Sequence, residues 1–237
     1  MINEEAYKFT KEFVGLKEIS GPKDERMIEV AHRLCKIEGP RGGNYSDEIP
    51  WCSAWVVLAI VCANIRRNPK RAIEMLERRG IELPVIKECF VYAKVDFDKT
   101  KDNDTLVPVV PPTWSADSKS WDTWGQSVPF SEAQRGDIVR LVRDGGGHVA
   151  FLDEDSLGKI MLTLLGGNQS NKVCSSNTYA RTRLVHVRRM AEAKPVVKPT
   201  PAPAPAAPQP TKEEVKQPEV QEGFFAKVKK FLFKVFG

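Results

Sequence analysis

The sequence predicts an α+β domain in which helices come first along the chain and a small antiparallel sheet follows. Helical patterns occupy the first part, whereas short β-branched segments separated by turn residues begin near residue 136. This order is typical of a fold whose helices pack together against one sheet. A length of 237 residues, with 41% hydrophobic and 28% charged content, agrees with a globular domain that carries attachments.

The predicted helices mix charged and apolar positions, except for one that is almost entirely apolar. They cover residues 3–15, 22–37, 51–65 and 69–80. Pro50 suits the entrance of the apolar helix, because proline lacks the N–H that would stay unpaired there. Further along the chain, residues 86–97 fit a strand and residues 101–114 are predicted to form a loop.

In the second part of the chain the spacing of apolar residues changes from a helical repeat to the alternation typical of strands. A short helix is expected over residues 115–125, and the strands follow it. Four strands are predicted, over residues 136–143, 147–155, 159–168 and 183–189. We expect them to form one antiparallel sheet, and residues 1–190 to form one domain.

Cys52 lies between Trp51 and Ser53, where the apolar helix is expected to begin. Unpaired amides and the positive end of the helix dipole favour an anion there, so a thiol in the first turn should have a lowered pKa. That is how a protein makes a nucleophile. It is also an ordinary place for a buried cysteine, so this segment alone leaves both interpretations open.

A cysteine nucleophile needs a base, and the base needs an orienting group. His148 begins a predicted strand after three glycines, and Asn168 and Gln169 end the next strand. If the two strands form a hairpin, His148 and Asn168 lie close together, and a helix end facing that edge brings Cys52 to His148. Each residue also has a structural interpretation: a histidine satisfied by the backbone, or a simple turn at the glycines.

The other histidines and cysteines point to no further site. We expect His32 to be solvated, His186 to be structural and Cys62 to lie in the core. Five cysteines without a C-x-x-C pair argue against a structural zinc site or any other metal site. The N-terminal residues lack the features of a signal peptide, so we expect synthesis in a reducing cytosol, without a disulfide framework.

Charge and hydropathy exclude two further classes of function. The net charge is +5, of which the tail over residues 191–237 carries +3. The body is therefore not a strongly basic nucleic-acid binder. The longest apolar run, residues 54–63, is too short to span a bilayer as a helix. We expect a monomer that needs no cofactor.

The tail divides into two segments. Residues 191–222 contain eight prolines and no aromatic residue, which predicts an extended linker. Residues 223–237 fit an amphipathic helix with phenylalanines on one face and lysines on the other. The residues expected to bind a membrane are Phe224, Phe225, Lys227, Lys230, Phe231 and Lys234. We expect anionic lipid or lipopolysaccharide as the partner, and docking of this helix on the body is the alternative.

Several motifs occur together in a familiar order. They are VGLKEISGPKDERMI, PWCSAWV, SADSKSWDTWG, RGDIVRL, GGHVAF and LLGGNQSN. This set resembles the CHAP-like cysteine amidases and peptidases of bacteriophage endolysins, over roughly residues 5–189. The resemblance implies a papain-like fold of the CHAP or NlpC type and hydrolysis of an amide bond in peptidoglycan. Residues 66–112 depart from it, and we interpret them as surface elaboration rather than a lid.

The resemblance also implies roles for particular residues. Cys52 matches the nucleophile and His148 the base, while Asn168 matches the residue that orients the histidine. Some relatives carry a Glu two residues earlier, where this chain has Gly166, so Gln169 is the rival for that role. By the same resemblance Trp51 and Ser53 shape the cleft, and the Cys52 N–H contributes to an oxyanion hole.

Three functions stay open from the sequence. The first is a phage-type endolysin that acts at the bacterial cell wall or periplasm, after export that does not use a signal peptide. The second is an interbacterial effector or virion-associated lysin with the same chemistry. The third is a degenerate papain-like module that binds wall or membrane without catalysis.

Overall fold

The computed structural model describes residues 2–20, 23–36, 49–100, 114–153 and 158–190. All of them belong to the first of two compact units, residues 1–196, and the second unit lies outside the described residues. The predicted linker over 191–222 and the predicted cationic helix over 223–237 therefore fall outside the described part of the chain, as does most of the loop predicted over 101–114.

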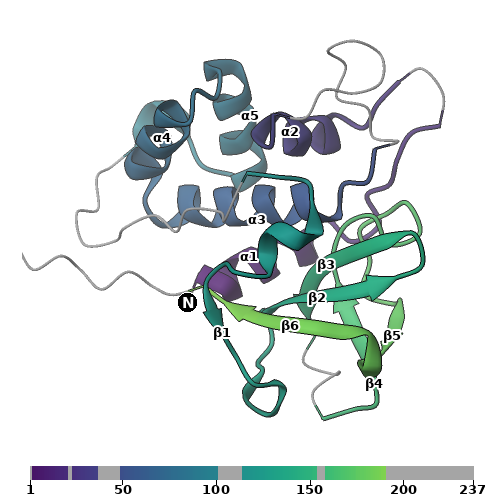
Figure 1. The fold of residues 1–237 in the computed structure, drawn as a ribbon. Coiled ribbons are helices and arrows are strands. Elements are labelled where there is room, and N and C mark those ends of the chain that lie inside the picture. The colour runs from purple at the N-terminus through teal and green to yellow at the C-terminus, as the bar shows by residue number, and fades with distance from the viewer. Residues whose placement is uncertain (1, 21–22, 37–48, 101–113, 154–157, 191–237) are drawn as a thin grey trace, which may run out of the picture. The chain divides into compact units, whose positions relative to one another are not determined.

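The described residues form an α+β fold, as the order of elements predicts (Figure 1). The helices come first: α1 (Ile2–Glu12), α2 (Arg26–Leu34), α3 (Cys52–Arg67), α4 (Pro69–Arg78) and α5 (Leu83–Ala93). An antiparallel sheet of six strands in the order β1-β6-β2-β3-β4-β5 follows. Its strands are β1 (Gln126–Ser127), β2 (Ile138–Arg143), β3 (Gly146–Leu152), β4 (Met161–Leu165), β5 (Thr178–Ala180) and β6 (Leu184–Arg189).

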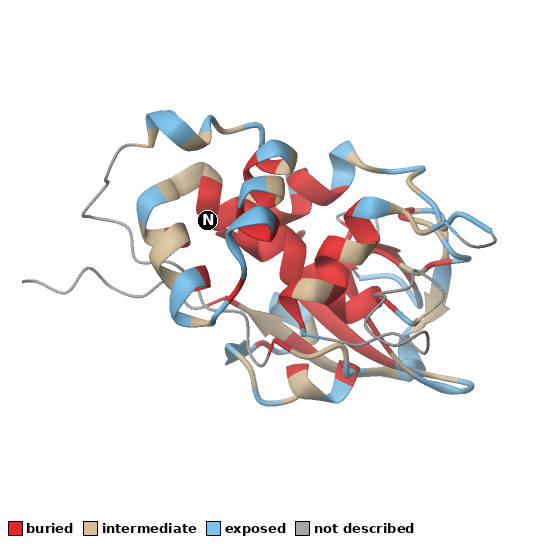
Figure 2. Cartoon of the chain, turned by 90° about the horizontal axis from the view of Figure 1, so that it is seen from above, coloured by how far each residue is buried: buried red, intermediate tan, exposed pale blue. Residues whose placement is uncertain are grey.

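Helix α3 is the centre of this unit. Every residue from Cys52 to Ile65 is buried, which agrees with a helix that is apolar on all sides. It packs against α1, α2, α4, α5 and strand β3. Figure 2 shows the buried residues concentrated in these inner elements and the exposed ones on the outer helices and loops. The sequence therefore predicts the start and the burial of this helix correctly.

Residues 83–93 form helix α5, so the strand expected over residues 86–97 is wrong. The buried residues Val85, Ile86, Cys89, Phe90 and Ala93 repeat at helical spacing and pack in the main core. Pro84 lies in the first turn, and Lys94 ends the helix in a left-handed conformation with φ of 59°. The aromatic and β-branched residues suggested a strand, but their spacing buries one face of a helix.

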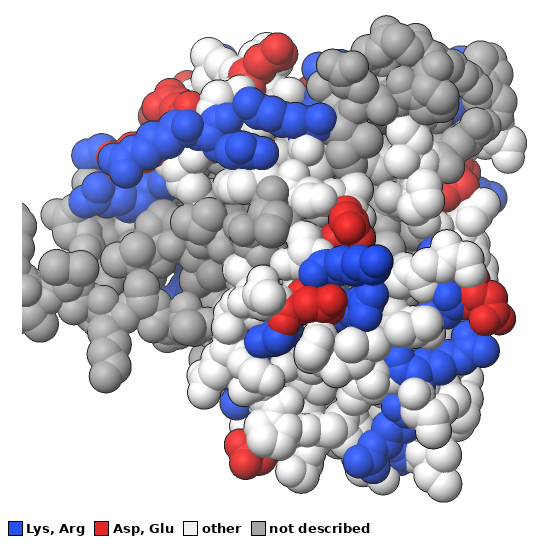
Figure 3. Space-filling view, viewed as in Figure 1, with Lys and Arg blue, Asp and Glu red and all other residues white. Residues whose placement is uncertain are grey.

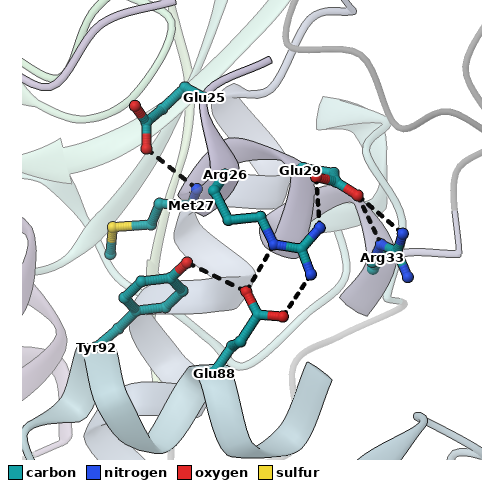
Figure 4. Close-up of polar contacts among 7 residues, drawn as sticks. All are labelled: Glu25, Arg26, Met27, Glu29, Arg33, Glu88 and Tyr92. Atoms are coloured by element: carbon teal, nitrogen blue, oxygen red, sulfur yellow. Dashed lines mark hydrogen bonds and ion pairs between the residues drawn. The ribbon is translucent and has the colours of Figure 1, made fainter. Parts of the chain in front are cut away.

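The interpretation of residues 66–112 as surface elaboration is also wrong for their described part. Both α4 and α5 bury apolar residues against α3. Arg26 of α2 also forms a bidentate ion pair with Glu88 of α5, and Glu29, Arg33 and Tyr92 extend this network (Figure 4). Arg26 is exposed and its partners are half-buried, so water still screens the network and each ion pair contributes about 1 kcal/mol. A buried aromatic such as Phe90 contributes about 2 to 3 kcal/mol, so packing holds α5 in place.

The four predicted strands are confirmed as β2, β3, β4 and β6, while the short strands β1 and β5 were not predicted. The short helix expected over residues 115–125 is a single 3₁₀ turn, η2, over Ser118–Trp121. One face of the sheet faces the helices through Ile138, Val149 and Phe151. The other face carries a second apolar cluster, built around Val139, Leu141, Ala150, Leu152, Leu162, Leu164 and Val187.

The remaining predictions about single residues have mixed outcomes. His32 is fully buried, so the expectation of a solvated histidine is wrong, whereas Cys62 lies in the core as expected. The five cysteines are buried and free. On the face shown in Figure 3, Lys and Arg side chains occur in separate groups with Asp and Glu beside them. Among the described helices, none has both the length and the apolar character needed to cross a membrane.

Candidate active site

Cys52 is the first residue of α3, as the sequence predicts. Its thiol therefore lies among the amides of the first helical turn, which have no partner within the helix. The residue is 3% exposed. Burial raises the pKa of the thiol, although N–H groups of Val149, Ser53 and Cys52 itself, together with the charge of Arg143, act in the opposite direction. The expected lowering of this pKa is wrong, because desolvation outweighs the helix terminus.

The contact with Val149 follows from the way in which β4 leaves β3. Strand β4 pairs with β3 only at Phe151 and Leu152, and the chain then turns away at Gly166. The N–H of Leu152 donates to the Asp137 carbonyl, on the side of β2. In an antiparallel strand the N–H groups point alternately to the two neighbours, so the N–H of Val149 points to the opposite side, where β4 no longer pairs. The end of α3 occupies this place and brings the Cys52 sulfur to the Val149 N–H. This N–H belongs to the peptide bond that follows His148.

His148 lies in β3 opposite Leu141 and is fully buried. Its imidazole stacks on the ring of Tyr179 in β5, with ring centroids 5.5 Å apart and planes at 26°. Burial and the charge of Arg143 lower the pKa of His148 to about 3, against a partial opposing effect of Gln169. At neutral pH the imidazole is therefore uncharged. Among the described contacts none joins the Cys52 thiol directly to the imidazole, whose two ring nitrogens have no hydrogen-bond partner in this part of the chain.

Gln169 is the polar side chain that faces His148. It is fully buried, and its Nε2 donates to the carbonyl oxygens of Leu164, Gly166 and Cys174 at 3.0, 3.2 and 2.6 Å. These bonds fix the amide so that Oε1 is left for the imidazole, and the contact with His148 favours the protonated ring. This contact is not a formed hydrogen bond, because Oε1 of Gln169 and both ring nitrogens of His148 have no hydrogen-bond partner in the described structure. Catalytic hydrogen bonds often tighten only when substrate binds.

Asn168 is placed differently from Gln169. It is partly exposed and adopts a left-handed conformation with φ of 53°, which asparagine tolerates well in turns. No contact joins Asn168 to His148 among those the structure describes. The geometry thus favours Gln169, the rival residue, as the group that orients the imidazole.

The two glycines before Asn168 are required by close packing. A Cβ on Gly166 would lie 2.7 Å from the Cβ of Ala150, so this position leaves no room for the Glu that some relatives carry. A Cβ on Gly167 would lie 2.3 Å from the ring of Trp51 and 2.7 Å from Trp55. The glycines therefore allow the end of β4 to lie directly against α3, which brings Gln169 close to the site.

Trp51 and Ser53 support the site from within the core. Both are fully buried. Trp51 donates from Nε1 to Glu18 at 2.7 Å. The Ser53 hydroxyl donates to the Ser115 carbonyl and accepts from Trp121 Nε1, both at 2.7 Å. Their side chains thus anchor the segments around the start of α3, and the role in shaping a cleft that the resemblance implies stays a prediction.

Two residues near the site were not predicted. Tyr179 reaches His148 because β5 pairs with β4, and Arg143 ends the strand that pairs with β3. Neither stands out in the sequence, because their positions depend on strand register. Only the alternation of apolar residues in β2 could have placed Arg143 on the same face as Leu141 and His148.

The described residues contain no group of three or more His, Cys, Asp and Glu side chains that could hold a metal ion. Comparison with models of known protein families and with curated proteins found no match for this chain.

Proposed function

We propose that this chain hydrolyses an amide bond in bacterial peptidoglycan, with Cys52 as the nucleophile and His148 as the base. The observation that carries the proposal is the convergence of three separate segments. The first turn of α3 places the Cys52 sulfur at the peptide bond after His148, and the locked amide of Gln169 faces the imidazole. The resemblance of the motifs to CHAP-like hydrolases supplies the substrate class.

The chemistry follows the general scheme of a cysteine hydrolase. A ring nitrogen of His148 takes the thiol proton as the sulfur attacks the carbonyl carbon of the amide. The imidazolium then gives this proton to the amine nitrogen as the C–N bond breaks, which leaves a thioester on Cys52. A water molecule, deprotonated by His148, attacks the thioester, and the carboxylic acid and the free thiol are released.

Two features of the site suit these steps. The Cys52 N–H in the first helical turn is available to a developing oxyanion, because such amides have no partner within the helix. The fixed Gln169 carbonyl oxygen can accept an N–H of the imidazole and stabilise its charged form in the transition state. The resting His148 is neutral and can accept a proton, but its pKa of about 3 makes it a weak base for a thiol whose own pKa is raised. The proposed transfer therefore requires the Gln169 oxygen to stabilise the imidazolium when substrate binds.

A second candidate function is a wall-binding or membrane-binding module without catalysis. It is favoured by the closure of the site, because Cys52 is 3% exposed and burial holds its thiol protonated. For catalysis, substrate must displace groups that cover the sulfur. The same closure would suit a papain-like fold that has lost its activity.

The test is turbidity loss of purified peptidoglycan with the full chain and with Cys52→Ala. Cys35→Ala is the matched control, because Cys35 is also buried but lies at the end of α2. We expect the wild type and the control to clear the suspension and Cys52→Ala to be inactive, and fragment masses then identify the bond. Equal clearing by all three would refute the role of Cys52. Absence of clearing by all three would favour the binding module.

The setting of this activity is also a proposal. A phage-type endolysin, an interbacterial effector and a virion-associated lysin would share the chemistry and differ in how the protein reaches the wall. The cationic segment over residues 223–237 has the composition of a membrane-surface helix, with anionic lipid or lipopolysaccharide as its expected partner.

A further inference from the structure

Arg143 is a charged side chain beside the candidate active site with no assigned role. It is the last residue of β2 and pairs with Gly146 of β3, two residues before His148. Directly opposite residues of an antiparallel pair share a face, and their diagonal neighbours lie within reach of long side chains. Arg143 and His148 are such diagonal neighbours, and Gly146 offers no side chain between them.

Within the described part of the chain, the side chain of Arg143 takes part in no hydrogen bond or ion pair, while its backbone pairs with Gly146. It is half-buried. The neighbouring acid, Asp144, lies 3.9 Å from Arg183 instead. A guanidinium presents five donors in a rigid fork, and such a group on the edge of a buried site is suited to an anion that arrives from outside.

The charge of Arg143 acts on every titratable group of the site. Burial raises the pKa values of Cys52 and Tyr179 and lowers that of His148; the charge of Arg143 opposes the first two shifts and adds to the third. The strand register agrees with this, because His148 is the diagonal neighbour of Arg143 and the N–H of the next residue, Val149, contacts the Cys52 sulfur. An anion bound by Arg143 would therefore lie near the thiol.

We propose that Arg143 binds a carboxylate of the substrate next to the bond that Cys52 attacks. The assignment deepens the proposed function, on which it rests for the identity of the substrate. Arginine binds carboxylates through two parallel hydrogen bonds, which gives orientation as well as affinity. The preferred substrate class is thus a peptide amide flanked by a free carboxylate, as occurs in the stem peptides of peptidoglycan. A substrate whose carboxylate is amidated should be a poorer one.

A simpler role for Arg143 is to stabilise the Cys52 thiolate without contacting substrate. The two roles of Arg143 predict different reactivities of Cys52 toward charged and neutral reagents. Stabilisation of the thiolate changes the reactivity of Cys52 toward all reagents alike. A carboxylate site adds to this general effect a preference for reagents that carry a carboxylate, and this preference appears in the ratio of the two rates.

The test is alkylation of Cys52 in the full chain by iodoacetate and by its neutral isostere iodoacetamide. Either reagent forms a carbon–sulfur bond with release of iodide, and mass spectrometry locates the adduct, with Cys52→Ala as the blank. We expect the rate ratio of iodoacetate to iodoacetamide to fall about tenfold in Arg143→Gln and to be partly kept in Arg143→Lys. Arg183→Gln, which removes a nearby exposed charge, should keep the ratio of the wild type.

Three outcomes would overturn the assignment. They are an unchanged ratio in Arg143→Gln, an equal fall in rate for both reagents, and no reaction of Cys52 with either reagent in the folded protein. The alkylation does not depend on peptidoglycan as substrate. If the ratio behaves as expected but peptidoglycan is not cleared, the carboxylate site stands and the proposed substrate is wrong. If peptidoglycan is cleared, Arg143→Gln should raise KM on fragments with free carboxylates and leave KM on amidated fragments unchanged.

Discussion

His148 is buried against Tyr179 and Gln169, close to the charge of Arg143, and this environment sets its protonation. An imidazole removed from water near the charge of Arg143 does not bind a proton until the pH is far below its usual range. The unfolded chain binds that proton near pH 6.5. Between these two values the unfolded state holds more protons than the folded state. The free energy of unfolding therefore rises with pH in this window.

The first prediction concerns the stability of the wild type in acid. The contribution of His148 is fully present above pH 6.5 and is lost as the pH falls toward the folded pKa of about 3. We expect a loss of roughly 1.4 kcal/mol per pH unit within the window from this residue. Urea unfolding at pH 7, 5.5 and 4.5 measures it. His148→Gln, which cannot titrate, should show a shallower dependence, and parallel slopes for the two proteins would contradict the prediction.

The second prediction separates the two candidates for the orienting residue. Gln169→Ala removes the amide that faces His148, so we expect the hydrolysis rate to fall by roughly 100-fold. Loss of the three bonds to buried carbonyl oxygens should also lower stability by about 1 to 3 kcal/mol.

Asn168→Gly is the matched control for this change. Glycine accepts the left-handed conformation of residue 168 without strain, so the variant should keep both its fold and its rate. Initial rates on peptidoglycan and unfolding midpoints measure both effects. A larger loss of rate in Asn168→Gly than in Gln169→Ala would return the orienting role to Asn168.

At the scale of elements, the site depends on the contact between the end of β4 and the first turns of α3. Gly166 and Gly167 lie against Ala150, Trp51 and Trp55, without room for a side chain. In the sequence these glycines are most simply a turn. In the folded protein they also allow close packing of the residues after β4 against α3, and this packing places Gln169 next to the imidazole of His148.

The third prediction tests this contact. In Gly167→Ala the new methyl group would overlap the Trp51 ring, so α3 and β4 must separate. We expect a loss of stability of about 1 to 3 kcal/mol and slower hydrolysis, because Gln169 and Cys52 move apart. Gly145→Ala is the comparison: its Cβ meets open space, and only its positive φ of 84° should cost about 1 kcal/mol. Thermal unfolding measures the loss of stability, and initial rates measure the effect on hydrolysis. Equal effects of both substitutions on the rate would contradict a role of the contact between Gly167 and Trp51.

At the scale of the whole molecule, the described body and the cationic tail have separate chemistry. The body carries the candidate active site, and the tail carries four lysines and five phenylalanines within residues 224–237. A linker rich in proline separates the two segments in sequence. Hydrolysis and membrane binding should therefore be separable by mutation.

The fourth prediction uses the full chain with Lys227, Lys230 and Lys234 changed to Gln. Each lysine near an anionic surface contributes roughly 1 kcal/mol, so binding to vesicles with anionic lipid should weaken by about 100-fold. Clearing of purified peptidoglycan should be unchanged. Vesicle sedimentation at two salt concentrations measures the binding. If the triple variant binds as tightly as the wild type, the tail does not act through its charge.

The sequence by itself determined the order of helices and strands, the start of α3 at Cys52 and the place of His148 in β3. These features are local, because they follow from apolar runs, proline, glycine and alternation within short segments. For the same reason β5 was missed, since a strand of three residues has little pattern of its own. Helix α5 was misread because aromatic and β-branched residues favour a strand until the helical spacing of the buried ones is known.

Only the tertiary structure decided which segments meet around the candidate site. The side of His148 on which Gln169 lies, the stack of Tyr179 on His148 and the place of Arg143 depend on strand register and on close contacts between segments far apart in the chain. The direction of the Cys52 pKa shift also depends on the fold. The helix terminus favours the thiolate, but the amount of water removed around the sulfur is set by packing, and here burial is the larger effect.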